Sequence, residues 1–394
     1  MNKRKISSIG LIFTLLCFNL VSCGGTNDEP TPVAPLKVFA TSVAGTGNLS
    51  SWTDAGGNTG IAAGDAVCQA RATAAGLSGT YKAWLSDNTT DAYCHIQGYD
   101  GHTVSDNCGQ ITLPTAAGPW IRTDGNPFAD TIDKLINNNQ VFTPVRYDEN
   151  GALIANLFYT GTDIDGTYGG LNCNNWTDGT VGASAGYGST QGASSGWTDD
   201  GGISCSGAIR LLCFQTGTGG PLPSITAPAS SKKVFVTSTT HNGNLGGLSG
   251  ADAICVSRAT TAGIANAANF KAWLSTSSPA VNAIDHLTSN GPWHRLDGVK
   301  VADNKAALIA SGSTALFTAI SQTETGAYIS TQYYNVWTGT DDHGVGLVNN
   351  CSNWTDDTSG SQGQAGKATI SDGNWTNWTS WSCNNLYALY CFED

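Results

Sequence analysis

Apolar and polar positions follow one another in an order that occurs twice along the chain. Segments 38–41 and 234–237 are β-branched and aromatic, which predicts a strand at the start of each copy. An Ala-rich stretch then begins at Asp65, its counterpart begins at Asp252, and each ends at a glycine, as is typical of a helix. A Lys-Ala-Trp-Leu run and a closing apolar run follow in both copies, and both predict strands. One helix against mainly antiparallel strands predicts the α+β class.

The repetition covers most of the chain and indicates a duplicated domain. Cys173-Asn-Asn-Trp-Thr-Asp returns, for example, as Cys351-Ser-Asn-Trp-Thr-Asp. The period is too long for a solenoid unit of about 20–50 residues. We therefore expect a first domain at residues 36–214, a Gly/Pro/Ser-rich linker at 215–231 and a second domain at 232–394.

The N-terminus has the layout of an export signal. Three basic residues precede an apolar run that is too short and interrupted to cross a bilayer, which takes about 20 apolar residues. The run ends in Leu20-Val-Ser-Cys23, which resembles a bacterial lipobox and implies a lipoprotein signal peptide at residues 1–22 with acylation of Cys23. An ordinary cleaved signal with a chance cysteine is the alternative. Residues 23–35 are polar and Pro-rich, which predicts a flexible tether.

Charge and cysteine content limit the partners and the compartment. The formal net charge is −12, which argues against nucleic acid and other anionic polymers as partners. Of the 12 cysteines, Cys17 leaves with the signal and Cys23 takes lipid. The remaining even number, in an exported chain without Cys-x-x-Cys, predicts disulfides rather than a metal or redox site.

Several short sequence segments of the second copy resemble the endostatin domain of collagens. They are Gly-Ala-Asp-Ala-Ile-Cys255, Phe270-Lys-Ala-Trp-Leu-Ser275, Val336-Trp-Thr-Gly-Thr-Asp-Asp-His-Gly344, Cys351-Ser-Asn-Trp354 and Ser382-Cys-Asn-Asn-Leu-Tyr-Ala-Leu-Tyr-Cys391. More closely, both copies look like a bacterial lipoprotein domain placed in the C-type-lectin-like superfamily beside endostatin. The resemblance covers nearly all of each copy and implies two tandem C-type-lectin-like domains. It implies no single activity, because one fold hosts many functions.

The resemblance also implies nested disulfides, the first cysteine of each copy with the fourth and the second with the third. The implied pairs are Cys68–Cys213, Cys173–Cys205, Cys255–Cys391 and Cys351–Cys383. Cys94 and Cys108 lie in an insertion found only in the first copy, and we expect them to pair with each other. Endostatin's metal-binding histidine cluster and basic heparin-binding surface have no counterpart here, nor do the acidic motifs of sugar-binding C-type lectins.

Acidic residues of the first copy are candidate calcium ligands. They are Asp163, Asp165, Asp199 and Asp200. Calcium takes six to eight oxygen ligands, which clustered carboxylates on irregular loops supply. The alternative is that these residues form turns, their commonest use. Only Asp163 keeps an acidic counterpart, Asp341, so a calcium site is expected in the first copy and not in the second.

Two tryptophans of the second copy, Trp378 and Trp381, have no aromatic counterpart in the first. The shared framework therefore does not require them. On a polar loop they are candidates for stacking on a sugar or anchoring a protein partner. The alternative is a local core beneath that loop.

No motif for catalysis is present. His95 and His286 lie at similar places in the two copies, but neither Gly-x-Ser-x-Gly nor His-Glu-x-x-His occurs. A hydrolase would need a nucleophile, a base and an orienting group that converge, so we expect a non-enzymatic protein.

The sequence thus predicts a lipid-anchored protein of the bacterial cell envelope, held in the bilayer by Cys23, in the outer membrane and exposed at the surface. Its tandem domains would bind a glycan or an extracellular protein through Trp378, Trp381 and the 163–165 loop. The alternative is a structural or assembly component of the envelope without a soluble ligand. A hydrolase is the third hypothesis.

Overall fold

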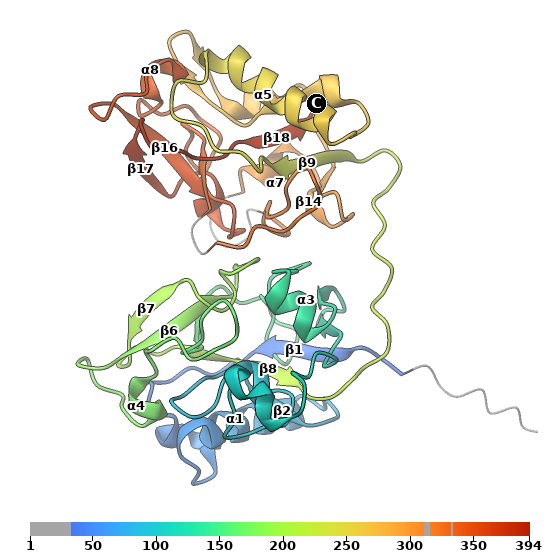
Figure 1. The fold of residues 1–394 in the computed structure, drawn as a ribbon, viewed down its shortest axis with the longest axis vertical. Coiled ribbons are helices and arrows are strands. Elements are labelled where there is room, and N and C mark those ends of the chain that lie inside the picture. The colour runs from blue at the N-terminus through green and yellow to red at the C-terminus, as the bar shows by residue number, and fades with distance from the viewer. Residues whose placement is uncertain (1–32, 311–315, 332–333) are drawn as a thin grey trace, which may run out of the picture. The chain divides into compact units, whose positions relative to one another are not determined.

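The computed structural model describes residues 33–310, 316–331 and 334–394. The predicted signal peptide, Cys23 and most of the tether lie outside the described residues. Residues 33–394 form one compact unit of helices and several β-sheets, which confirms the α+β class (Figure 1). Gln215 belongs to the last strand of the first copy, so this strand continues one residue beyond the predicted boundary.

An eight-stranded sheet organises the first copy, in the order β4-β3-β1-β8-β5-β6-β7 with β2 also paired to β8. Its strands are β1 (Leu36–Ala40), β2 (Tyr81–Ala83), β3 (Trp120–Arg122), β4 (Pro127–Ala129), β5 (Leu157–Tyr159), β6 (Ser184–Ser189), β7 (Gly201–Ser204) and β8 (Arg210–Gln215). The α-helices are α1 (Gly60–Ala74), α2 (Ala92–His95), α3 (Ile132–Asn137) and α4 (Cys173–Trp176). Both predicted strands at the ends of this copy, β1 and β8, are present and pair antiparallel.

The second copy repeats this arrangement with the sheet divided. One sheet has the order β10-β18-β9-β13-β14 and another the order β15-β16-β17, beside the hairpin β11-β12. The strands are β9 (Lys232–Val236), β10 (Phe270–Ala272), β11 (Thr276–Ser277), β12 (Ala280–Val281), β13 (Trp293–His294), β14 (Lys300–Ala302), β15 (Asn335–Trp337), β16 (Gln362–Lys367), β17 (Thr379–Ser382) and β18 (Tyr390–Glu393). The helices are α5 (Gly247–Thr261), α6 (Ala283–His286), α7 (Lys305–Leu308), α8 (Cys351–Trp354) and the 3-10 turns η4 (Ala267–Asn269) and η6 (Gly373–Trp375).

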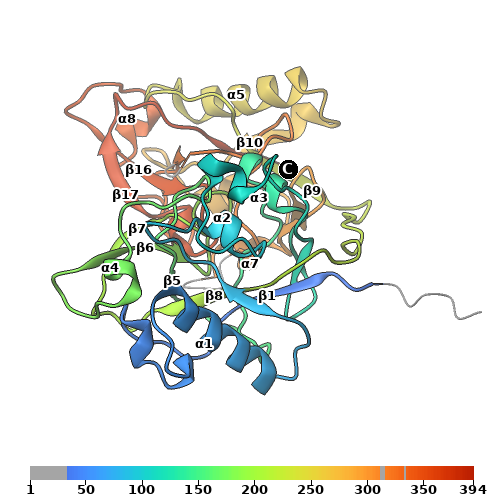
Figure 2. The same cartoon turned by 60° about the horizontal axis from the view of Figure 1, so that its bottom comes forward.

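The long helix of each copy starts earlier than the sequence predicts. α1 begins at Gly60 rather than Asp65, and α5 begins at Gly247 rather than Asp252. The aspartates lie inside the helices, where each carboxylate accepts a hydrogen bond from the backbone of the neighbouring strand. α1 packs on β2 and β8, and α5 packs on β10 and β18 (Figure 2). These aspartates therefore fasten helix to sheet instead of capping the helix.

Five disulfides hold the copies internally. They join Cys68 to Cys213, Cys94 to Cys108, Cys173 to Cys205, Cys255 to Cys391 and Cys351 to Cys383. These are the same pairs that the resemblance and the insertion implied. The outer bond of each copy connects the long helix to the closing strand, across 145 residues in one copy and 136 in the other.

Equivalent segments of the two copies pair with each other. Gly192 and Ile370 form an antiparallel bridge, and each lies five residues before a matched buried tryptophan, Trp197 or Trp375. The Ala193 N–H donates to the Thr369 carbonyl at 2.8 Å, and the Ser371 N–H donates to the Gln191 carbonyl at 3.0 Å. The two bonds join equivalent positions, so the copies meet here with local twofold symmetry.

Two buried arginines extend the contact between the copies. Arg295 Nη2 donates to the carbonyls of Val141 (3.1 Å) and Phe142 (3.2 Å). Arg146 Nη2 donates to the carbonyls of Leu316 (2.6 Å) and Phe317 (3.0 Å), which are the counterparts of the first pair. Each copy thus supplies one arginine whose guanidinium donates hydrogen bonds to the equivalent turn of the other copy.

Candidate functional site

A polar cleft of about 420 Å³ opens where the copies meet. We call it the inter-copy cleft. Its polar lining consists of Asn156, Ser189, Gln191, Asp342, Asp372, Asn374 and Asn377. Its volume lies within the range of small-molecule sites, about 300–1,000 Å³.

Loops that follow or precede short strands supply these side chains. Asn156 precedes β5, Asp342 follows β15, and Asp372 caps η6 by accepting from the Asn374 N–H at 2.9 Å. A Cβ added to Gly373 would lie 3.4 Å from the Asp342 Cβ, so the two acidic loops are in contact. The cleft therefore carries two carboxylates on adjoining loops of the second copy.

The ionisable residues that line the cleft, Asp342 and Asp372, are both acidic. Burial raises the pKa of the Asp372 carboxyl, and the charge of nearby Asp200 adds to the rise. None of the described residues that line the cleft is Lys, Arg or His. The side chain that ion-pairs with Asp200 is Lys367, whose Nζ lies 2.7 Å from that carboxylate.

Gln191 brings an unsatisfied polar atom to the cleft. Its side chain is only 3% exposed, and its Oε1 accepts from the Ser371 hydroxyl at 3.1 Å. Its Nε2 is buried and has no hydrogen-bond partner among the residues that the structure describes. An unpaired buried donor of this kind costs about 1–3 kcal/mol.

The position that the local symmetry relates to Ser189 carries a lysine. Ser189 pairs with Leu157 across β5 and β6, and in the second copy the equivalent pair across β15 and β16 is Lys367 with Asn335. The small Ser189 leaves space, whereas the Lys367 side chain is buried and reaches Asp200. The two copies therefore differ at this position.

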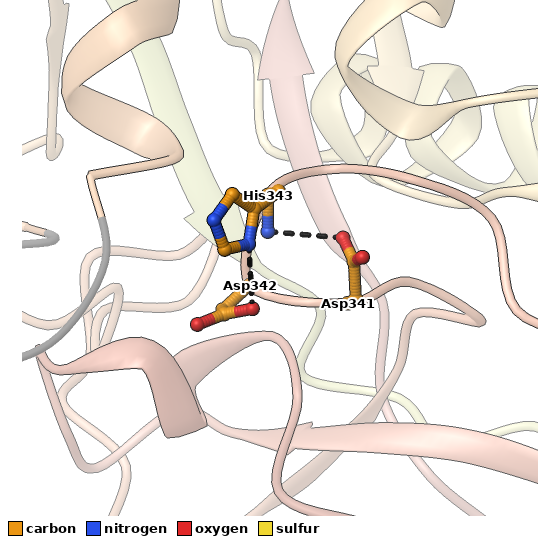
Figure 3. Close-up of side chains that lie close together, drawn as sticks. All are labelled: Asp341, Asp342 and His343. Carbon is orange, nitrogen blue, oxygen red and sulfur yellow. Dashed lines mark hydrogen bonds and ion pairs between the residues drawn. The ribbon is translucent and has the colours of Figure 1, made fainter.

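Asp341, Asp342 and His343 form a compact group next to the cleft (Figure 3). The His343 Nδ1 lies 2.9 Å from Asp342 Oδ1. Asp341 Oδ1 accepts from the backbone N–H groups of His343 (2.9 Å) and Val345 (2.8 Å), so this carboxylate closes a turn. It is the one group of three metal-binding side chains within 4.8 Å among the described residues.

The predicted calcium ligands of the first copy are not gathered in this way. Within the described residues, Asp163, Asp165, Asp199 and Asp200 form no group of three with ligand atoms within 4.8 Å of one another. Asp165 instead accepts from the backbone and hydroxyl of Thr167, as the turn alternative predicts. Asp200 is engaged by Lys367. The acidic side chains that do meet are in the second copy, where no calcium site was expected.

Trp378 follows Asn377, which lines the cleft, whereas neither Trp378 nor Trp381 is among the lining residues. Their ring centroids lie 6.0 Å apart. Trp378 is half-buried under the Lys367 ammonium, which lies 5.0 Å from its ring centroid. Trp381 is 37% exposed and its edge meets Tyr387 at 6.3 Å. Trp378 therefore fits the alternative of a local core in part, because it is half-buried. Trp381 is exposed at the surface.

His95 and His286 belong to the framework of the copies. His95 lies 2.9 Å from Asp65 through Nε2 and 2.7 Å from Asp100 through Nδ1. His286 Nε2 lies 3.0 Å from Asp252, the counterpart of Asp65. Burial by itself lowers the pKa of His95, but the hydrogen bonds to the two aspartates outweigh it and the pKa is raised. The recurrence of both Asp and His in the two copies was the sequence feature that could have revealed this pairing.

Comparison with known proteins adds a family of unknown function. Residues 238–371, from just after β9 to just before η6, match the family described as protein of unknown function DUF1554. No curated protein matches the chain. Among the residues that the structure describes, none of the helices combines the length and apolar character that crossing a membrane requires.

Proposed function

We propose that this chain is a lipid-anchored, non-enzymatic binding protein of the bacterial cell envelope, built from two tandem C-type-lectin-like domains, and that its inter-copy cleft binds a glycan. The observation that carries the proposal is the composition of the cleft. Carboxylate and amide side chains converge in it, and Trp381 of the same copy is exposed. Such groups accept from and donate to sugar hydroxyls, while an aromatic ring packs on the apolar face of a sugar.

The proposed location is supported by the lipobox-like Leu20-Val-Ser-Cys23 and by the disulfides. Five disulfides suit an exported protein, because thiols stay reduced in the cytosol. The non-enzymatic assignment is supported by His95 and His286, which are engaged with aspartates of their own copies. The repeated strand order and nested disulfides support the lectin-like fold.

A glycan array probed with the chain starting after residue 35 tests the proposal. We expect saccharide binding that Asn374→Ala and Asn377→Ala each weaken about tenfold, because both side chains line the cleft. Ile111→Ala is the matched control, since Ile111 is 99% exposed and lies in the first-copy insertion. Absence of saccharide binding, or binding that neither cleft variant changes, would overturn the proposal. Capture of a protein ligand in its place would favour the extracellular-protein hypothesis.

A further inference from the structure

We infer that Lys367 and Asp200 condense to an amide, so that the folded chain carries a covalent link between its two copies in addition to its disulfides. The new bond joins Lys367 Nζ to Asp200 Cγ and releases one water molecule. This modification forms within the chain itself and needs no ligand, so it does not depend on the proposed glycan function.

The first argument is the contact between the two reacting groups. Lys367 Nζ lies 2.7 Å from Asp200 Oδ1. The two residues are 167 positions apart and belong to different copies, so the folded structure, and not the local sequence, holds them together. Intramolecular groups that are well oriented reach effective molarities on the order of 10⁵–10⁸ M. The contact therefore supplies the proximity that condensation requires.

The second argument is the burial of both partners. Their side chains are 6% and 10% exposed, whereas in the pair Lys271–Asp394, with the same 2.7 Å separation, the lysine is 29% exposed. Among the lysine–aspartate pairs of the described residues, Lys367–Asp200 is the one in which neither side chain exceeds 10% exposure. Exclusion of water protects a bond of this kind from hydrolysis and favours loss of the released water.

The third argument is the protonation of the carboxyl group. An amide forms from a neutral amine and a neutral carboxyl, and burial favours neutral forms. Burial raises the pKa of Asp200 even though the charge and hydrogen bond of Lys367 oppose the rise. Burial also acts to raise the pKa of Asp394, but hydrogen bonds from Lys271 and from the backbone outweigh it and lower the pKa to about 2. The carboxyl of the buried pair is thus the one that more readily takes up a proton.

The reaction balances within the pair. The Lys367 ammonium first gives a proton to the Asp200 carboxylate, which leaves a neutral amine beside a neutral carboxyl. The nitrogen lone pair then attacks Cγ, as the amine of a nucleophilic lysine does with carbonyl substrates, and the C–N bond forms. A proton moves from this nitrogen to the hydroxyl oxygen, the C–O bond breaks and water leaves. No oxidant, reductant or second substrate is consumed.

Mass spectrometry of the chain starting after residue 35, with every disulfide reduced and alkylated, tests the inference. We expect the wild-type chain to be lighter than its calculated mass by one water molecule, and its protease digest to contain a branched peptide in which Lys367 is joined to Asp200. Lys367→Arg keeps the positive charge but lacks the amine, so it should have the full calculated mass. Lys271→Arg is the matched control: it changes the lysine of the more exposed pair and should retain the loss of water.

A wild-type chain of full calculated mass would overturn the inference, whether or not the variants fold. A loss of water that persists in Lys367→Arg would overturn it as well, because cyclisation at an Asp-Gly sequence such as Asp200-Gly201 also releases water. A digest in which Lys271 is joined to Asp394 would contradict the requirement for burial. Saccharide binding enters none of these measurements, so failure of the amide bond leaves the proposed glycan function to its own test.

Discussion

Lys367 of β16 extends to Asp200, which precedes β7 in the other copy, and their Nζ and Oδ1 atoms lie 2.7 Å apart. Both side chains are nearly buried, with 6% and 10% of their surface exposed. Burial raises the pKa of Asp200, while the charge and hydrogen bond of Lys367 oppose the rise. This pair fixes the copies to each other on the side opposite the cleft in the local symmetry.

Removing one partner of this pair should destabilise the protein. Lys367→Met or Asp200→Asn is expected to lower the free energy of unfolding by about 3–5 kcal/mol, because the remaining group is left buried without its partner. Denaturant titration measures the loss. The double variant should lose less than the sum of the two single losses; simple additivity would show that the pair is not coupled.

The His95 network predicts a pH-dependent stability. The folded-state pKa of His95 is raised, so its contribution is fully present below the unfolded value of about 6.5 and is lost as pH rises through the folded pKa. His95→Gln, which keeps neutral hydrogen bonds, should therefore cost most stability at pH 5.5 and progressively less toward pH 9. Unfolding free energies of both proteins at three pH values check this.

His102→Gln provides the control for that series. The side chain of His102 is 44% exposed, and its contact with Asp106 is at the surface. Its loss should change stability by less than about 0.5 kcal/mol at any pH. A pH-independent effect of His95→Gln would contradict the role assigned to the charged imidazole.

The disulfide of the insertion should contribute measurably to stability. Cys94 and Cys108 are 14 residues apart, and closing a loop of about 15 residues is worth about 3 kcal/mol in the chain-entropy model. The double variant Cys94→Ala, Cys108→Ala should lower the free energy of unfolding by about 2–3 kcal/mol. An unchanged midpoint in denaturant would show that packing of the buried Tyr93 and Ile96 holds the insertion without the bond.

Calcium should leave the melting temperature unchanged. The first-copy aspartates are not gathered, and in the second copy Asp341 is engaged in closing its own turn. Differential scanning calorimetry with excess calcium and then with chelator measures the shift. A rise of several degrees that Asp163→Asn abolishes would restore the calcium site expected from the sequence.

The sequence predicted features that depend on neighbouring residues better than features that depend on contacts between the two copies. The strands β1 and β9 and the long helices follow from local apolar patterns, and the nested disulfides are the pairs that the resemblance to endostatin implied. The start of α1 was misplaced because Asp65 resembles a helix cap, whereas its carboxylate bonds to Ala83 and His95.

The cleft could not be derived in this way. Asn156 and Gln191 lie in the first copy and Asp372 lies in the second, so these residues line one cleft only where the copies meet. Nothing in their local sequence distinguishes them from turn residues. Comparison of the copies singled out Trp378 and Trp381, but neither is among the residues that line the cleft.

The bridge between Gly192 and Ile370 has the form of a contact in a symmetric dimer, where one surface patch meets itself. In a homodimer, any substitution near the axis appears on both sides at once. Here the two halves are encoded separately, so Ser189 and Lys367 could diverge while the bridge between them was retained. In a duplicated chain, one side of the axis can therefore hold the two copies together while the residues on the other side change independently.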